Sequence, residues 1–70
     1  MLRFLVEQID YLLRLCKLGK NLAARKCFYD QAFGALQYHV ALFPGDHAEA
    51  ESLWNDYRVQ FEELVYSQRR

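Results

Sequence analysis

The sequence predicts a small all-α fold, a single helical domain over residues 1–70 built from three helices. Glycine and proline interrupt the chain at few places, threonine is absent and β-branched residues are sparse, so little favours strands. Between those interruptions, apolar residues recur at helical spacing. A chain of 70 residues is one domain, and a domain of that size buries only about 60% of its unfolded surface.

The first helix is predicted at about residues 2–18, and it is apolar around most of its circumference. One apolar face consists of Leu2, Leu5, Val6, Ile9, Leu12, Leu13 and Cys16. A second apolar face lies beside it and consists of Phe4, Tyr11, Leu15 and Leu18. Together they span roughly 240°, which is more than two neighbours in a three-helix bundle can cover.

The boundary after this helix is marked by Gly19 and Asn21. Glycine often follows the C-terminus of a helix, and asparagine caps the N-terminus of the next one. Lys17 and Lys20 also suit the negative end of the first helix dipole. The second helix is therefore predicted at about residues 21–43. The alternative is one unbroken helix over residues 2–43, about 60 Å long at a rise of about 1.5 Å per residue.

The second helix also has a broad apolar surface. Its main face consists of Leu22, Tyr29, Phe33, Leu36, Val40 and Phe43, and this face is widened by Phe28, Ala35, Tyr38 and Leu42. The remaining strip is small or polar: Ala23, Lys26, Cys27, Asp30, Gly34, Gln37 and Ala41. We interpret this strip as the solvent side of the helix. The alternative is a groove that allows another helix to approach closely.

The third helix is predicted at about residues 47–68. Pro44 cannot continue the preceding helix, and Asp46 followed by Glu49 three residues later forms the pattern of a capping box. One apolar stripe about 120° wide is typical of an outer helix in a bundle. It consists of Ala50, Leu53, Trp54, Tyr57, Phe61, Leu64 and Val65.

The apolar surplus of the first two helices predicts self-association. Hydrophobic residues form 53% of the chain, more than a lone domain of this size easily hides. We expect a homodimer, the commonest assembly of identical chains, that completes the helical bundle. The expected interface residues are Phe4, Tyr11, Leu15, Leu18, Phe28, Ala35, Tyr38 and Leu42. A different protein is the alternative partner.

The charge pattern supplies an alternative function, a nucleic-acid-binding regulator. Net charge is zero, so no overall field attracts nucleic acid or anionic lipid. Positive residues nevertheless cluster around the first turn, in a segment without acidic residues: Arg14, Lys17, Lys20, Arg25 and Lys26. Apart from Asn21, which we assign to a helix cap, this segment has no Ser, Thr, Asn or Gln to read base edges, and no short recognition helix follows a turn. We therefore rank nucleic-acid binding below self-association.

Side chains that carry chemistry are scarce, so we expect neither an enzyme nor a bound cofactor. No nucleophile has an obvious base beside it, and neither a Cys-x-x-Cys nor a Glu-x-x-His metal-binding pattern occurs. His39 lies in the apolar sector of the second helix, where we expect a hydrogen-bonded histidine in the interior or at an interface. A hairpin turning near Gly19 separates Cys16 from Cys27, so we expect two free thiols.

The sequence also bears on location. Acidic residues occur too early for a secretory signal, and no apolar run is long enough to span a membrane. We expect a cytoplasmic protein with no membrane partner. The functional hypothesis is a small helical interaction or regulatory module.

Overall fold

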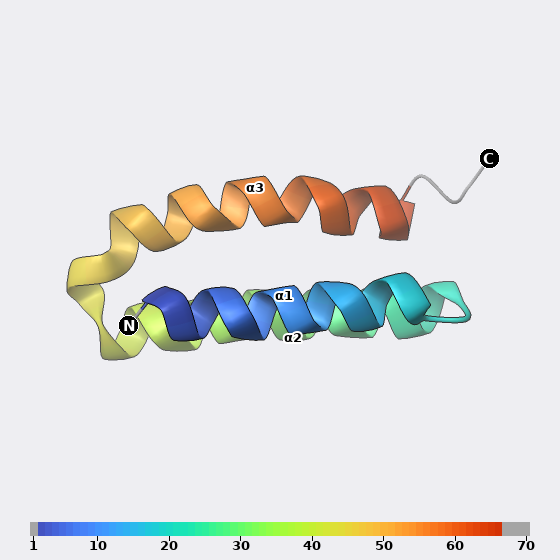
Figure 1. Cartoon of the computed structure of the whole chain (residues 1–70), viewed down its shortest axis with the longest axis horizontal. Coiled ribbons are helices and arrows are strands. Elements are labelled where there is room, and N and C mark those ends of the chain that lie inside the picture. Colours follow the sequence, from blue (N-terminus) through green and yellow to red (C-terminus); the bar gives the residue numbers. More distant parts are fainter. Residues whose placement is uncertain (1, 67–70) are drawn as a thin grey trace.

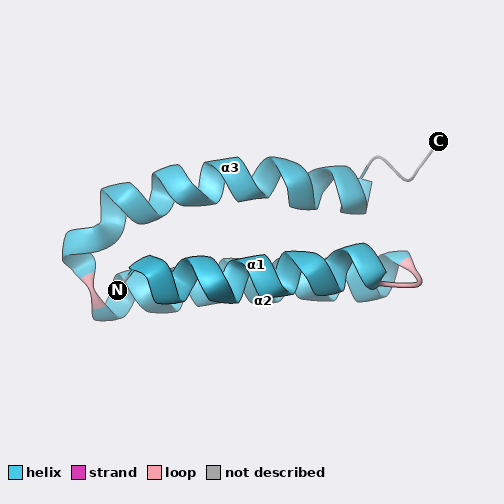
Figure 2. Ribbon diagram, in the orientation of Figure 1, coloured by secondary structure: helices cyan, strands magenta, loops and turns pink. Residues whose placement is uncertain are grey.

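The computed structural model describes residues 2–66, and these residues form three α-helices and one short 3₁₀ turn. Helix α1 spans Leu2–Leu18, α2 spans Leu22–Leu42, the 3₁₀ turn η1 spans Pro44–Asp46 and α3 spans His47–Tyr66. Figure 2 shows the described part of the chain as helices joined by short loops. The all-α bundle predicted from the sequence is confirmed, and residues 67 and 68 of the predicted third helix lie outside the described residues.

The helices run up, down and up, and each contacts the other two. Figure 1 shows α1 and α2 as an antiparallel pair with α3 lying along both of them. The bundle is elongated, with extents of 40 × 16 × 16 Å. Because a 20-residue helix is about 30 Å long, the long axis is set by the helices themselves.

The core runs along the line where the three helices meet. Helix α1 supplies Leu5, Ile9, Leu12, Leu13 and Cys16, whereas α2 and α3 supply Ala32, Leu36, Ala50, Trp54, Phe61 and Val65. These α1 residues belong to the first apolar face predicted above, so the sequence places the buried side of this helix correctly. Within residues 2–66, every buried polar side-chain atom has a hydrogen-bond partner.

The turn between α1 and α2 confirms the predicted break and excludes one unbroken helix. Asn21 caps α2 by accepting a hydrogen bond from the Ala24 amide at 2.8 Å. Gly19 does not adopt a positive φ, so conformational freedom does not explain the glycine. Its site is crowded instead, because an added Cβ would lie 3.0 Å from Cγ of Arg25 and 3.2 Å from the Cys16 carbonyl oxygen.

The turn between α2 and α3 corrects the predicted capping box. Asp46 directly precedes α3, but its carboxylate lies 2.9 Å from Nε2 of His39. Among the hydrogen bonds of the described residues, neither Asp46 nor Glu49 caps an amide of α3. The buried imidazole of His39, 8% exposed, outcompetes the helix amides for the carboxylate because those amides can still bond to water. The predicted hydrogen-bonded interior histidine is therefore confirmed.

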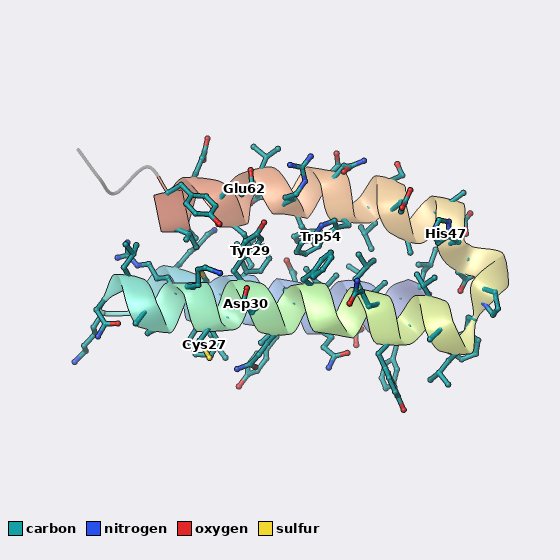
Figure 3. The ribbon with its side chains drawn as sticks, turned by 180° about the vertical axis from the view of Figure 1, so that it is seen from behind. Cys27, Tyr29, Asp30, His47, Trp54 and Glu62 are labelled. Atoms are coloured by element: carbon teal, nitrogen blue, oxygen red, sulfur yellow. The ribbon has the colours of Figure 1, made fainter. Side chains whose placement is uncertain are left out.

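An aromatic layer joins α2 to α3. Tyr29 stacks on Trp54 with ring centroids 6.0 Å apart and also contacts Phe61 at 5.7 Å. Phe33 contacts Trp54 at 5.7 Å from the next turn of α2. Figure 3 shows Tyr29 and Trp54 pointing into the space between these two helices.

The buried side of α2 coincides only in part with its predicted main face, since Leu36 is buried and Tyr29 and Val40 pack against the core. The buried residues are Ala32, Leu36 and His39, whereas Leu22, Phe33 and Phe43 are exposed or at the border of exposure. The shift has a physical reason, because α2 must approach α1 and α3 at once and small Ala32 permits that approach. Tyr29 and Phe33 of the predicted face pack at its edge against Trp54 of α3.

Candidate self-association face

A stripe of apolar side chains on α1 is left uncovered by the bundle. Phe4 is 80% exposed, Tyr11 58% and Leu18 73%. These residues recur every seven positions, so they lie above one another on the helix. Leu15 lies in the same stripe but is half-buried, and it packs partly against the core.

Helix α2 presents a matching stripe. Tyr38 is 69% exposed and Leu42 is 54% exposed. Phe28 and Ala35 lie on the same side and are half-buried, because part of each packs against the core. All eight residues predicted for the interface are therefore at least partly accessible.

The two stripes lie side by side, because side chains of both helices line the same hollows. One hollow of roughly 480 Å³ lies between Tyr11 of α1 and Ala35 and Tyr38 of α2. A second, of roughly 400 Å³, lies between Phe4 and Leu42. Neither hollow has a lining residue from α3. We call this surface the outer face; its residues are Phe4, Gln8, Tyr11, Leu15 and Leu18 of α1 and Phe28, Gln31, Ala35, Tyr38 and Leu42 of α2.

Two glutamines complete the outer face and were not singled out by the sequence analysis. Gln8 lines both hollows and Gln31 lines the larger one. Their heptad spacing to the apolar residues is the signal that could have identified them. Gln31 also donates a weak hydrogen bond to Sγ of Cys27 at 3.4 Å, which leaves its carbonyl oxygen available as an acceptor.

The chemistry available on the outer face is apolar packing with a few polar contacts. Large exposed apolar surfaces are unusual on small monomers and mark sites of interaction. From Phe4 to Leu18 the face is about 21 Å long. The axes of the two helices are about 9 Å apart, so the face is roughly 20 Å wide. Its area is therefore roughly 400–500 Å² per chain. Burying two such faces would remove on the order of 1,000 Å² from water, the lower bound for a specific interface.

The predicted basic patch is divided by the fold. Arg25 is half-buried, and its side chain donates to the carbonyl oxygens of Gly19 at 3.1 Å and Leu64 at 3.3 Å. Lys26 forms an ion pair with Asp30 at 3.3 Å. Arg14, Lys17 and Lys20 are exposed. Arg25 thus ties the first turn to the end of α3, and this structural role removes it from a phosphate-binding surface.

The two cysteines are free, as predicted. Burial raises the pKa of the Cys16 thiol, and the positive charge of Arg25 opposes this shift. Cys27 is exposed, and Figure 3 shows it on the side of α2 away from α3. No group of three or more metal-ligating side chains is found within residues 2–66.

Two tyrosines connect α3 to the other helices. The Tyr29 hydroxyl donates to Glu62 at 3.1 Å, and burial together with that carboxylate raises the Tyr29 pKa to about 12. The Tyr57 hydroxyl donates to Asp10 at 3.1 Å, and burial raises its pKa as well. Asp10 is therefore directed toward α3 rather than toward the outer face.

The comparisons with known proteins identify no relative. No protein-family model matches the chain, and neither a curated protein nor a solved structure shows significant similarity to it. No helix within the described residues combines the length and the apolar character needed to cross a membrane.

Proposed function

We propose that this protein is a small helical interaction module that self-associates through the outer face of α1 and α2. The observation that carries the proposal is the exposure of Phe4, Tyr11, Leu18 and Tyr38 on one continuous surface. On a monomer these apolar side chains remain in contact with water. Packing against a second outer face removes these side chains from water and is worth about 25 cal/mol per Å² before association costs.

The module has a core of its own, so association concerns the surface rather than the whole fold. The core of eleven apolar residues lies beside and beneath the outer face, and two of its members, Leu5 and Leu12, line the floor of the hollows. A change confined to the outer face should therefore weaken association without unfolding the chain. This separation gives the proposal a direct test.

The test compares Phe4→Glu with Leu12→Glu by analytical ultracentrifugation and circular dichroism. Native protein at about 100 µM is expected to sediment as a dimer, with a melting temperature that rises with concentration. Phe4→Glu should give a folded monomer, because Phe4 is 80% exposed and an acidic residue suits the first turn of a helix. Leu12→Glu should unfold the chain, because Leu12 is buried in the core.

A native protein that remains an 8.4 kDa monomer at this concentration contradicts the proposal. Asp56→Arg serves as the surface control, since Asp56 is exposed on α3 and remote in sequence from the outer face. It should leave the association unchanged. If Asp56→Arg and Phe4→Glu weaken association equally, the interface includes α3 and the proposed face is wrong.

The proposal includes no catalytic activity and ranks nucleic-acid binding second. Arg25 and Lys26 already have partners within the chain, which leaves Arg14, Lys17 and Lys20 of the predicted patch for phosphate contacts. A gel-shift titration with duplex DNA and with RNA separates the two functions. Submicromolar binding that weakens steeply with added salt would favour the nucleic-acid function, because counterion release dominates such complexes.

A further inference from the structure

We infer that the partner on the outer face is a second copy of this chain, placed antiparallel so that α1 packs on α1 and α2 packs on α2. The inference rests on the proposed self-association and specifies its geometry. The twofold axis of this dimer runs across the outer face and passes over both Tyr11 and Ala35. Four features of the outer face support this arrangement.

The first feature is the spacing of the large residues on the two helices. Phe4 and Leu18 are each seven residues from Tyr11, and Phe28 and Leu42 are each seven residues from Ala35. Tyr11 and Ala35 line the same hollow, so the midpoints of the two stripes lie side by side. A single twofold axis over these midpoints therefore places both stripes in register at once.

The second feature is the shape of the two ends of the outer face. At one end, Phe4, Tyr38 and Leu42 surround the hollow of roughly 400 Å³. At the other end, Leu18 is 73% exposed and forms a projecting side chain. The axis brings Leu18 of each copy against Phe4 of the other. Each hollow is thereby filled, as close packing at an interface requires.

The third feature is charge along the edge of the outer face. Glu7 lines a hollow together with Phe4 and Gln8, so it borders the face. Arg14 lies one heptad further along the same edge and is exposed. In the antiparallel arrangement, Glu7 of each copy faces Arg14 of the other. If the two α1 helices ran parallel, Glu7 would instead lie at the same height along the helix axis as Glu7 of the other copy, and Arg14 at the same height as Arg14.

Polar groups on the α2 side also find partners in this arrangement. Gln31 and Tyr38 lie at nearly equal distances from Ala35, on opposite sides of it. The axis therefore places the Tyr38 hydroxyl of one copy near the Gln31 carbonyl oxygen of the other. A tyrosine buried at an interface needs such an acceptor for its hydroxyl.

Charge reversal tests the antiparallel arrangement. Glu7→Arg and Arg14→Glu each replace two attractive contacts per dimer by two repulsive ones, and each should weaken dimerisation about tenfold. The double variant restores opposite charges across the interface with the native composition, and it should recover the native dissociation constant. Asp56→Arg on α3 is the matched control and should not change it. Sedimentation equilibrium measures the dissociation constants of the native protein and of the four variants.

Disulfide trapping tests the position of the axis. In a Cys27→Ser background, Tyr11→Cys should form a disulfide-linked dimer on oxidation, because the axis places residue 11 opposite its own copy. Phe4→Cys is the matched control and should not link to itself, since the axis separates the two copies of residue 4 by about 21 Å.

The outcomes distinguish this inference from the proposed function. Recovery in the double variant together with trapping at position 11 supports the antiparallel arrangement. A dimer whose association ignores both charge reversals, or one that traps through position 4, overturns the arrangement and leaves self-association intact. A native protein that stays monomeric overturns both.

Discussion

At the scale of single residues, a few side-chain hydrogen bonds join the helices of the bundle. Arg25 donates to carbonyl oxygens at two helix ends, and Asp46 reaches across a turn to His39. Neither contact follows from helical periodicity, because each crosses a turn at the end of a helix, and the bond from Arg25 to Leu64 also joins two packed helices. The sequence predicted a hydrogen-bonded His39 but assigned Asp46 to a cap.

Tyr29 makes the stability of the fold sensitive to alkaline pH. Burial and the Glu62 carboxylate raise its pKa to about 12 in the folded protein, from about 10 in the unfolded chain. The unfolded chain therefore loses the proton first, and the free energy of unfolding should fall as pH rises from about 10 to about 12. Below about pH 10 both states keep the proton, and Tyr29 adds no pH dependence.

Urea denaturation at a series of pH values measures this dependence, with Tyr29→Phe as the control. The variant should lose stability less steeply above pH 10, because a phenylalanine ring cannot ionise. Tyr57 contributes in the same direction and remains in both proteins. Identical pH profiles for native protein and variant would show that Tyr29 ionises equally in both states.

A second prediction separates the two possible roles of Asp46. Asp46→Ala should lower the free energy of unfolding by about 1–3 kcal/mol, because it leaves the buried imidazole of His39 without its partner. In a His39→Leu background the same change should cost much less. A double-mutant cycle followed by thermal or urea unfolding measures this coupling. A full cost of about 1 kcal/mol in both backgrounds would identify Asp46 as a helix cap instead.

At the scale of elements, helix bounds are predicted well and helix faces less well. Bounds depend on local signals, and Asn21 and Pro44 supply these directly. The buried side of a helix depends on its neighbours. For α1 the first of the two predicted apolar faces coincides with the buried side, whereas for α2 the small residue Ala32 lies on the buried side. Residue size along the sequence does not reveal where helices come closest.

The glycine in the middle of α2 provides a prediction at this scale. Gly34 is exposed, and an added Cβ would meet no atom within 4 Å. Gly34→Ala should therefore raise the free energy of unfolding by about 0.5–1 kcal/mol, because alanine loses less backbone entropy in a helix. Urea denaturation measures the change.

Gly19→Ala is the contrasting variant, and it should destabilise the chain. Its Cβ would lie 3.0 Å from Cγ of Arg25 and 3.2 Å from a backbone oxygen of Cys16. If Gly34→Ala instead destabilises the protein, the small-residue strip of α2 packs against another helix. That result would favour the groove interpretation of this strip over the solvent interpretation.

At the scale of the whole molecule, five of the eight predicted interface residues line two hollows between α1 and α2: Phe4, Tyr11, Ala35, Tyr38 and Leu42. The sequence predicted two apolar stripes on two helices, and each stripe follows from periodicity. Their adjacency, the hollows between them and the contribution of Gln8 and Gln31 depend on how the hairpin closes. Periodicity assigns a residue to a side of its own helix and does not position one helix against another.

The placement of the single tryptophan separates two equilibria that are otherwise difficult to distinguish. Trp54 is buried beside Tyr29 and Phe33 between α2 and α3, whereas the hollows of the outer face have no lining residue from α3. Unfolding exposes the indole to water and should shift its emission to longer wavelength. Dilution that separates two copies leaves the indole in the same surroundings, so its emission should stay constant while the sedimenting mass falls. One optical signal thus follows folding alone.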